Sequence, residues 1–457
     1  MPAPLTRSLG QFAASLKYEA LPAKAVEVAR LGFTDFVAVM FAGLTEPVLR
    51  IVTSTMVRTD PKGEARICLG RERASGIDAA LANGVAGHAL DYDDVALAGH
   101  PSTVLVPAIL AEAEAIGADG RAAVTAYVAG YETWARLVER DPDPYHRKGW
   151  HPTAVAGPVA AAAAIANLRR LDAEQATMAI GIGASLSAGL VANFGTMTKP
   201  FHAGRAAASG VTAARLAQNG MTASADAIEH PLGLLAALSP GGRADRDTPL
   251  DDLGREWRIV ATGLNVKKYP MCYATHRSID AFTDLVEAHD LKAADVAGID
   301  VTIGKTQSMM LRNHRPQTGL EAKFSMEFAM ASALIARRNG LNELTDEFVR
   351  RPDVQAAIEK VNIATTDTVA ADDPIFATSD RVEVKLADGR RLTSPDVPFA
   401  RGHWELPLSR DELWAKFHDC AKSALGDKGA QDLFGELQAL DRLASLRDLR
   451  KAADLAA

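Results

Sequence analysis

The sequence predicts a mainly α protein, in which a large all-helical domain carries a smaller inserted α+β domain. Between residues 22 and 218, segments rich in Ala, Leu and Val follow one another with almost no alternation of polar and apolar residues. After residue 263, short strand patterns alternate with helical ones, and helical patterns return at the C-terminal end. We therefore expect a helical domain over 1–263 and 401–457, with the α+β domain at 264–400.

Each helix of the first half is predicted from an apolar segment and, at two places, from a start signal. Ser75 with Asp78, and Asp172 with Gln175, have the spacing of a capping box, in which side chains satisfy free helix amides. Their small residues predict close helix packing. The expected helices are 22–43, 75–90, 102–116, 121–139, 153–168, 172–190 and 204–218.

The α+β domain is predicted from a mixture of patterns. Helices are expected over 278–289, 323–339 and 353–361, and a strand over 300–303. Residues 381–385 and 391–393 read as two strands of a hairpin, joined by a turn that contains Asp388-Gly389. Ser409 and Glu412 have capping-box spacing and open the C-terminal helices.

Composition narrows the class of protein. At 457 residues the chain exceeds one ordinary core, and 48% hydrophobic with 23% charged residues is a globular composition. A formal charge of -7 argues against nucleic acid and anionic membranes as partners. The three cysteines lie far apart, and the N-terminal segment lacks the apolar core of a secretion signal. We expect a cytoplasmic protein.

Several common motifs are rejected. Gly181-x-Gly183 lies inside a helical pattern without a preceding strand, which argues against a dinucleotide site. Gly304-Lys305-Thr306 ends like a phosphate-binding loop, but Ile299 occupies the position of its first glycine. The sequence contains neither the metalloprotease His-Glu-x-x-His motif nor a Gly-x-Ser-x-Gly elbow.

The segment from residue 88 to 102 is the first candidate for chemistry. It holds the carboxylates Asp91, Asp93 and Asp94 and the imidazoles His88 and His100 in an otherwise apolar region. Carboxylates at this density repel one another unless each has a partner or a function. A bound divalent cation is conceivable, but the flanking histidines and the spacing do not fit a calcium loop, so no metal is predicted.

Basic and imidazole residues gather in short breaks between the expected helices. The breaks surround Lys148 and His151, Lys199 to Arg205, and Lys267 to Arg277. Helix ends present free amides that favour anions, so converging breaks would form a pocket of positive potential in an acidic protein. Such a pocket suits a small polycarboxylate substrate.

Five ordered segments, HALDYDD, GHPS, KGWHPT, MTKPFHAGRAA and KKYPMCYATH, resemble the MmgE/PrpD family over nearly the whole chain. That family includes 2-methylcitrate dehydratases, cis-aconitate decarboxylases and an iminodisuccinate epimerase. The resemblance implies a helical domain with an α+β lid, a homodimer, and no metal or organic cofactor. The positions that match the family's active site are Asp91, His100, His151, Lys199, Lys267 and Cys272.

Three positions depart from the pattern of decarboxylase-like members. Val95 stands in place of a threonine, Cys272 in place of a histidine, and Phe328, by our alignment, in place of a tyrosine. Loss of a hydroxyl that can donate a proton changes the reaction that a pocket supports. These departures argue against cis-aconitate decarboxylation and favour dehydration or epimerisation.

The expected roles follow from the chemistry of removing a proton beside a carboxylate. Fixed cations stabilise the developing dianion, and Lys199 and Lys267 are the first candidates, with Arg205 and Arg277 as carboxylate clamps. His202 is expected to line the pocket beside Arg205.

Proton transfer at neutral pH suits imidazoles. His100 and His151 both precede proline, which fixes their backbone in a break. Asp91 is expected to orient an imidazole or to act directly, and Cys272 is either a thiol acid/base or a small buried residue. Tyr145 is a possible phenol donor to the substrate.

Asp93 and Asp94 are expected to cap the helix end or to bind backbone amides, and His88 to be an internal partner of the motif. The sequence as a whole predicts a cofactor-independent hydro-lyase acting on a small di- or tricarboxylate, of the 2-methylcitrate dehydratase kind. Two alternatives stay open: an epimerase of a dicarboxylate, and a non-catalytic relative that binds a carboxylate.

Overall fold

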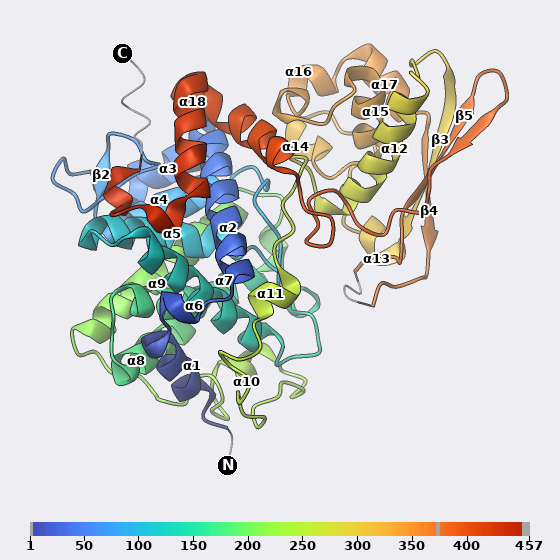
Figure 1. Ribbon diagram of the computed structural model, residues 1–457. Helices are drawn as coiled ribbons and strands as arrows, with labels where there is room; N and C mark the ends of the chain where they lie inside the picture. Colours follow the sequence, from blue (N-terminus) through green and yellow to red (C-terminus); the bar gives the residue numbers. More distant parts are fainter. Residues whose placement is uncertain (1–2, 372–374, 450–457) are drawn as a thin grey trace. The chain divides into compact units, whose positions relative to one another are not determined.

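The computed structural model describes residues 3–371 and 375–449, which form two compact units (Figure 1). The helical unit contains the chain up to Asn265 and again from Ser409, and the α+β unit is Val266–Leu408. The sequence placed these boundaries after residues 263 and 400. The prediction of a mainly α fold with a smaller α+β part is confirmed.

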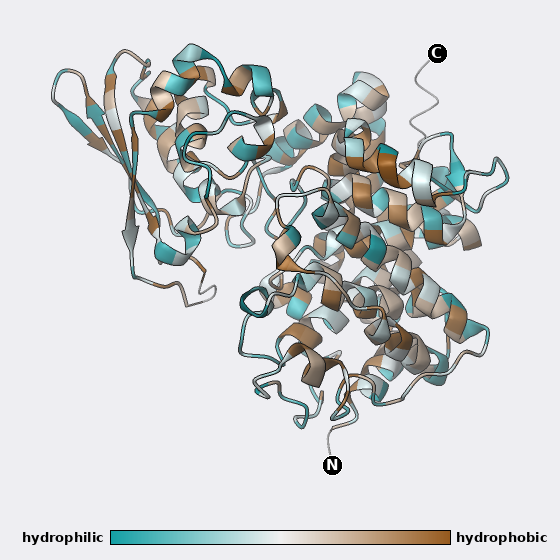
Figure 2. Ribbon diagram, turned by 180° about the vertical axis from the view of Figure 1, so that it is seen from behind, coloured by the Kyte–Doolittle hydropathy of each residue, from teal (hydrophilic) through white to brown (hydrophobic). Residues whose placement is uncertain are grey.

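The helical unit consists of apolar helices, whose many hydrophobic residues are brown in Figure 2 and largely buried. All seven predicted helices are present, but the helix expected to reach residue 190 ends at Ser185, and the last one begins six residues early, at Thr198. The helices are α1 Leu5–Ser15, α2 Ala23–Ala42, α3 Pro47–Met56, α4 Gly76–His88, α5 Ser102–Ile116, α6 Gly120–Val138, α7 Pro152–Leu168, α8 Ala173–Ser185, α9 Thr198–Gln218, α10 Leu234–Leu238, α11 Arg258–Thr262 and α18 Arg410–Gln438. A two-residue antiparallel pair, β1 Ala65–Arg66 and β2 Arg73–Ala74, lies beside them.

Small residues bring α4 and α9 into close contact, as the sequence predicted. A Cβ atom added at Gly204 would lie 2.3 Å from the carbonyl oxygen of Leu81, and one added at Gly84 would lie 2.7 Å from the Cα of Gly204. No larger side chain fits at this crossing without displacing backbone. The close approach matters because α4 ends at His88 and α9 begins beside Lys199.

The C-terminal segment completes the helical unit through a buried ion pair. Lys416 of α18 contacts Asp35 of α2 at 2.5 Å and donates to the carbonyl of Tyr92 at 2.9 Å. The segment Ala23–Thr45, which includes α2, has the length and hydropathy of a membrane-spanning helix, but 72% of its most apolar window is buried inside the protein. It therefore has the environment of a core helix.

The α+β unit contains a four-stranded sheet in the order β4-β3-β5-β6. β3 (Val296–Gly304) pairs parallel with β4 (Val361–Thr366) and antiparallel with β5 (Arg381–Leu386), which forms the predicted hairpin with β6 (Arg391–Thr393). Helices cover one face of the sheet (Figure 1). The helices of this unit are α12 His276–Ala288, α13 Lys305–Ser308, α14 Gly319–Ala322, α15 Met326–Ala336, α16 Asp346–Val349 and α17 Pro352–Ile358.

Two sequence predictions for this unit are wrong in part. The helix expected over 353–361 ends at Ile358, and the edge strand β4 that follows was not predicted. Its residues are mostly half-buried or exposed, so the apolar signal for a strand is weak. The helix expected over 323–339 is shorter: α15 begins only at Met326, where Ser325 caps it by accepting from the amide of Phe328, and it ends at Ala336.

Candidate active site

The connection between α4 and α5 carries the candidate chemistry in the helical unit. Three of its residues, Asp91, Leu97 and Ala98, have left-handed backbone conformations, with φ of 53°, 51° and 58°. Such conformations cost free energy in non-glycine residues and persist where the surroundings impose them, often at functional sites. At Asp91 the conformation directs the side chain toward His100 and Lys199.

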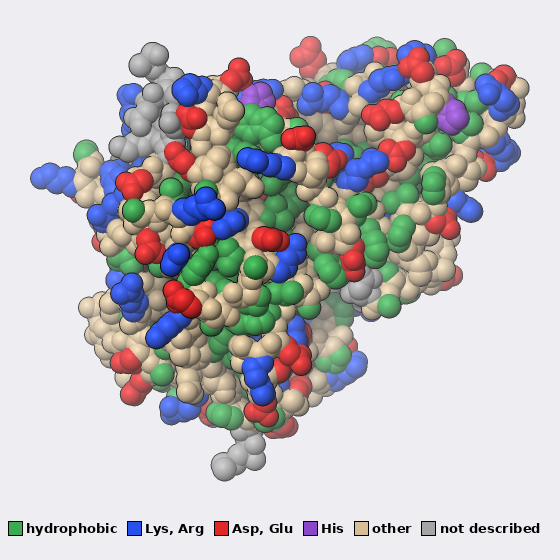
Figure 3. Space-filling model, viewed as in Figure 1, with side chains coloured by type: hydrophobic (Ala, Val, Ile, Leu, Met, Phe, Trp, Pro, Cys, Tyr) green, Lys and Arg blue, Asp and Glu red, His purple; other side chains and the backbone are tan. Residues whose placement is uncertain are grey.

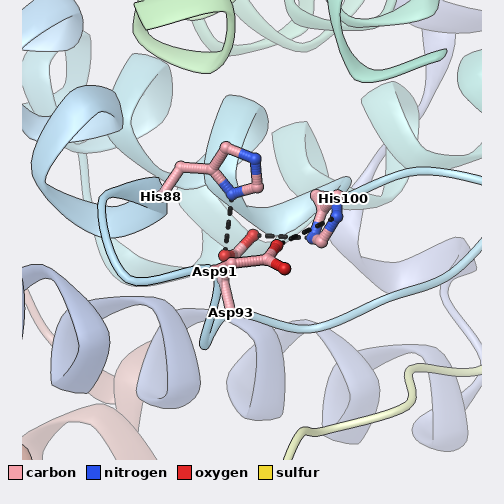
Figure 4. A group of neighbouring side chains, drawn as sticks. All are labelled: His88, Asp91, Asp93 and His100. Carbon is pink, nitrogen blue, oxygen red and sulfur yellow. Dashed lines mark hydrogen bonds and ion pairs between the residues drawn. The ribbon is translucent and has the colours of Figure 1, made fainter. Parts of the chain in front are cut away.

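Asp93 lies fully buried between two histidines (Figure 4). Its Oδ1 accepts from Nδ1 of His88 at 2.8 Å, and its Oδ2 lies 2.9 Å from Nδ1 of His100. Burial opposes the charge of this carboxylate, but the two imidazoles outweigh it and hold its pKa well below the usual range. The sequence placed Asp93 at a helix end, and the structure corrects this: Asp93 joins the two imidazoles.

The hydrogen-bond partners fix the tautomer of His100. Its Nδ1 faces two acceptors, Oδ2 of Asp93 and the carbonyl of Asp94, the latter also at 2.9 Å. Nδ1 must therefore carry the proton, which leaves a lone pair on Nε2 of the neutral ring. Nε2 lies 3.7 Å from Oδ1 of Asp91, and the same oxygen accepts from Nζ of Lys199 at 2.6 Å. A base and a cation thus lie on either side of Asp91.

A second pair of imidazoles adjoins this group. Nδ1 of His151, at the start of α7, lies 3.2 Å from Nδ1 of His202 on α9. One of the two nitrogens must donate and the other accept, so two neutral rings present one Nε2–H donor and one bare Nε2. Among the described residues, Nε2 of His151 is buried without a hydrogen-bond partner. Phe194 packs edge-on against His151 at 4.8 Å.

Five of the eleven histidines share the field of Lys199. Burial, with the positive charge of Lys199, lowers the pKa of His88 to about 4 and that of His146 to about 4. Burial and Lys199 also lower the pKa values of the other three, that of His151 well below its usual range. The remaining two of these five histidines are His100 and His202. Few histidine side chains are visible on the face of the protein drawn in Figure 3.

Asp94 contrasts with its neighbour Asp93. It accepts from the hydroxyl of Ser102 and weakly from the Ser102 amide at 3.4 Å, at the start of α5. The Ser102 hydroxyl also contacts the hydroxyl of Tyr127 at 2.8 Å. Burial, and then the negative charge of Asp35, raise the pKa of Asp94 well above its ordinary value. The pKa values of the two adjacent carboxyl groups are therefore shifted in opposite directions.

The structure thus brings together the predicted residues of the helical unit that carry the chemistry. We use the name histidine–lysine site for His88, Asp91, Asp93, His100, His151, Lys199 and His202. Two other predicted residues lie apart from these contacts. Arg205 is exposed and donates to Ser209 at 3.1 Å, and Tyr145 is buried, with Lys148 over its ring at 4.4 Å.

The other three predicted residues belong to the α+β unit. Lys267 is buried, and the amide of Cys272 donates to the carbonyl of Lys323 at 2.9 Å. Arg277 is buried in an ion pair with Asp380 at 2.8 Å.

Phe328 corrects one argument made from the sequence. It lies fully buried in the apolar core of the α+β unit and packs against Phe348 at a ring distance of 6.3 Å. The absence of a hydroxyl at this position therefore carries no weight against decarboxylation.

Sequence reasoning gave too little weight to three residues of this region. Asp93 was one of three adjacent carboxylates, and only the fold shows which of them meets the imidazoles. His146 and Phe194 flank one another at 5.9 Å, and Phe194 also lies under Lys199 at 5.2 Å. The position of His146 two residues before the Lys148–His151 break was the available signal.

The family of the chain is shown by comparison with known proteins. The MmgE/PrpD N-terminal domain matches residues 7–247, and the MmgE/PrpD C-terminal domain matches residues 269–440. The chain belongs to the MmgE/PrpD family. Family membership and its relatives support an enzyme of the lyase class.

Three similar proteins are all named cis-aconitate decarboxylase. Cis-aconitate decarboxylase of Mus musculus is 27% identical over 378 residues, covering 80% of this chain and 76% of that protein. The Homo sapiens protein of the same name is 27% identical over 380 residues, with the same coverage. Cis-aconitate decarboxylase of Aspergillus terreus is 22% identical over 470 residues, covering 97% of this chain and 95% of that protein.

Proposed function

We propose that the protein is a cofactor-independent lyase that acts on a small tricarboxylate by proton transfer, most specifically a hydro-lyase of the 2-methylcitrate dehydratase kind. The observation that carries this proposal is the tautomer of His100, whose bare Nε2 lies beside Asp91 and Lys199. The lowered pKa values of the surrounding histidines favour neutral rings, which accept protons. Abstraction of a proton next to a carboxylate requires such an acceptor.

The elimination is assigned to residues as follows. Nε2 of His100 takes the proton from the carbon next to a substrate carboxylate, while the ammonium of Lys199 binds that carboxylate and stabilises the developing negative charge. The C–O bond then breaks, and the hydroxyl leaves as water with a proton from the Nε2–H of the His151–His202 pair. The electron pair of the broken C–H bond forms the new double bond.

Decarboxylation of cis-aconitate is the second candidate, favoured by the names of the relatives. In that reaction the C–CO₂ bond breaks, and the same imidazole pair supplies a proton to carbon. Val95, half-buried beside the site and bridged to Asn265, is the departure within the helical unit that favours elimination of water. Activity in the cytoplasm as a homodimer stays a prediction.

Incubation of the full chain in D₂O with a panel of tricarboxylates, followed by NMR, tests the proposal. The panel contains 2-methylcitrate, citrate and cis-aconitate. A hydro-lyase forms an unsaturated tricarboxylate, and a decarboxylase releases CO₂ with deuterium incorporated into the product. Deuterium exchange without change of mass balance indicates an epimerase, and thermal stabilisation by ligand without exchange indicates a non-catalytic relative; either outcome overturns the proposal.

A further inference from the structure

Four potential metal ligands converge at the start of the α4–α5 connection: His88, Asp91, Asp93 and His100 (Figure 4). One ligand atom of each lies within 4.8 Å of those of the other three. Zinc holds its ligands at about 2.0–2.2 Å in a tetrahedron, which places them roughly 3.3 Å apart. Side-chain movements of about 1–2 Å would therefore close the cluster around an ion.

A second observation, apart from the spacing of the four ligands, indicates a cation: Oδ2 of Asp93 is incompletely hydrogen-bonded. The hydrogen bond of His100 Nδ1 is directed to the carbonyl of Asp94, so Oδ2 of Asp93 has only a poorly directed contact with the same nitrogen, at 2.9 Å. Within residues 3–371 and 375–449, no other donor serves this oxygen, and Asp93 is fully buried. A buried carboxylate oxygen that shares its single donor with another acceptor is incompletely satisfied, and a metal ion would satisfy it.

We propose that this cluster is an inhibitory site for a divalent transition metal ion of the Zn²⁺ type. Two imidazoles and two carboxylates are the ligands that Zn²⁺, Co²⁺ and Ni²⁺ accept, whereas Mg²⁺ and Ca²⁺ prefer oxygen alone. The two carboxylates match the charge of a divalent ion. Inhibition rests on the proposed function, because the ion would take up His100 and Asp91; metal binding does not.

Lys199 is the competitor of the ion in this arrangement. Its Nζ lies 2.6 Å from Oδ1 of Asp91, one of the four ligand groups, and it carries the same sign of charge as the metal. A metal ion must therefore displace this ammonium or bind against its repulsion. Removal of the lysine charge should strengthen metal binding, which a merely structural role of Lys199 does not predict.

Isothermal titration of the chelator-treated full chain with ZnCl₂, supported by the visible absorption of Co²⁺, tests the site. We expect one ion per chain, no response to MgCl₂, and binding weakened at least about tenfold by Asp93→Asn and by His88→Ala. Lys199→Met should bind Zn²⁺ about tenfold more tightly than the unmodified chain. His289→Ala, which alters an exposed histidine of the α+β unit, serves as the control and should bind as the unmodified chain does.

Two results would overturn the site: equal Zn²⁺ affinity of Asp93→Asn and the unmodified chain, or unchanged or weaker affinity in Lys199→Met. The second cannot be attributed to misfolding, because the expected change is a gain. If turnover is found and Zn²⁺ binds without slowing it, the inhibitory assignment is wrong. If no turnover is found, calorimetry still decides the metal site by itself.

Discussion

Two buried polar clusters, one in each unit, differ in how they use their hydrogen-bonding groups. In the α+β unit, the guanidinium of Arg277 contacts Asp380 at 2.8 Å and donates to Oε1 of Gln307 at 3.2 Å. The same group donates to the carbonyls of Ala377 and Pro398, each at 3.0 Å. Most of its donors are therefore engaged within the unit.

The partners of Arg277 are themselves held. Oδ2 of Asp380 accepts from the hydroxyl of Ser278 at 2.9 Å and from Nε2 of Gln307 at 3.0 Å. The cluster ties α12, α13 and the segment before β5 together. This arrangement resembles a structural connection, in which a substrate carboxylate would have to compete with existing partners.

The histidine–lysine site of the helical unit is different. It keeps bare or unpartnered ring nitrogens at His100 and His151 and a lysine whose partner, Asp91, belongs to the same motif. The comparison teaches that burial of a charge beside a family motif does not by itself indicate ligand binding. What distinguishes a site is the capacity that its side chains retain for another molecule.

The largest expected effect is on catalysis. Its absence would contradict the view that the histidine–lysine site, unlike the Arg277 cluster, is catalytic. His100→Ala should lower kcat/KM by about 10²–10⁴, because a general base is lost. The far-UV circular dichroism should not change. His289→Ala is the matched control with activity retained, and near-normal turnover of His100→Ala would remove His100 from the reaction.

In the α+β cluster the corresponding effect should fall on stability. Arg277→Ala leaves Asp380 buried without its cation and should lower the free energy of unfolding by roughly 3–5 kcal/mol. Urea denaturation measures this change. A variant of unchanged stability with a raised KM would instead assign Arg277 to substrate binding and would reverse the distinction drawn between the clusters.

The variant Asp93→Asn should change the pH dependence of activity at the histidine–lysine site. The charge of Asp93 raises the pKa of His100 against the larger lowering by burial, so its loss should lower that pKa further. Activity that needs the neutral ring appears as pH rises through this pKa; the acid limb should therefore move to lower pH. The plateau should fall about 10–100-fold, because a weaker and less oriented base remains. An unmoved acid limb contradicts the coupling of Asp93 to His100.

The smallest effect is expected at Asp94. The pKa of Asp94 is higher in the folded protein than in the unfolded chain. Below the unfolded-state pKa this difference does not affect stability. As pH rises from the unfolded-state pKa to the folded-state pKa, the free energy of unfolding falls. Asp94→Asn should remove this loss and increase the unfolding free energy by about 1 kcal/mol at pH 7 and by nothing at pH 3. Thermal denaturation at both pH values checks the sign, and a strongly destabilised variant at pH 7 would show that Asp94 is ionised.

Much of the fold could be predicted from local patterns. Long Ala- and Leu-rich segments favour helices, and capping residues such as Asp172 and Ser409 fix where helices start. The edge strand β4 escaped prediction because it is short and half-exposed, so its pairing with β3 depends on a partner sixty residues away.

The residues available for chemistry can be recognised from the sequence, because the histidines, the acidic segment 88–102 and the lysines in breaks between helices all lie in short motifs. The contacts that these residues make, and hence their protonation, depend on the tertiary structure. Asp93 and Asp94 are adjacent and identical, yet one meets two imidazoles and the other meets Asp35, and opposite pKa shifts follow. The reason is physical: the ionisation of a buried group depends on charges brought close by folding, which local sequence does not specify.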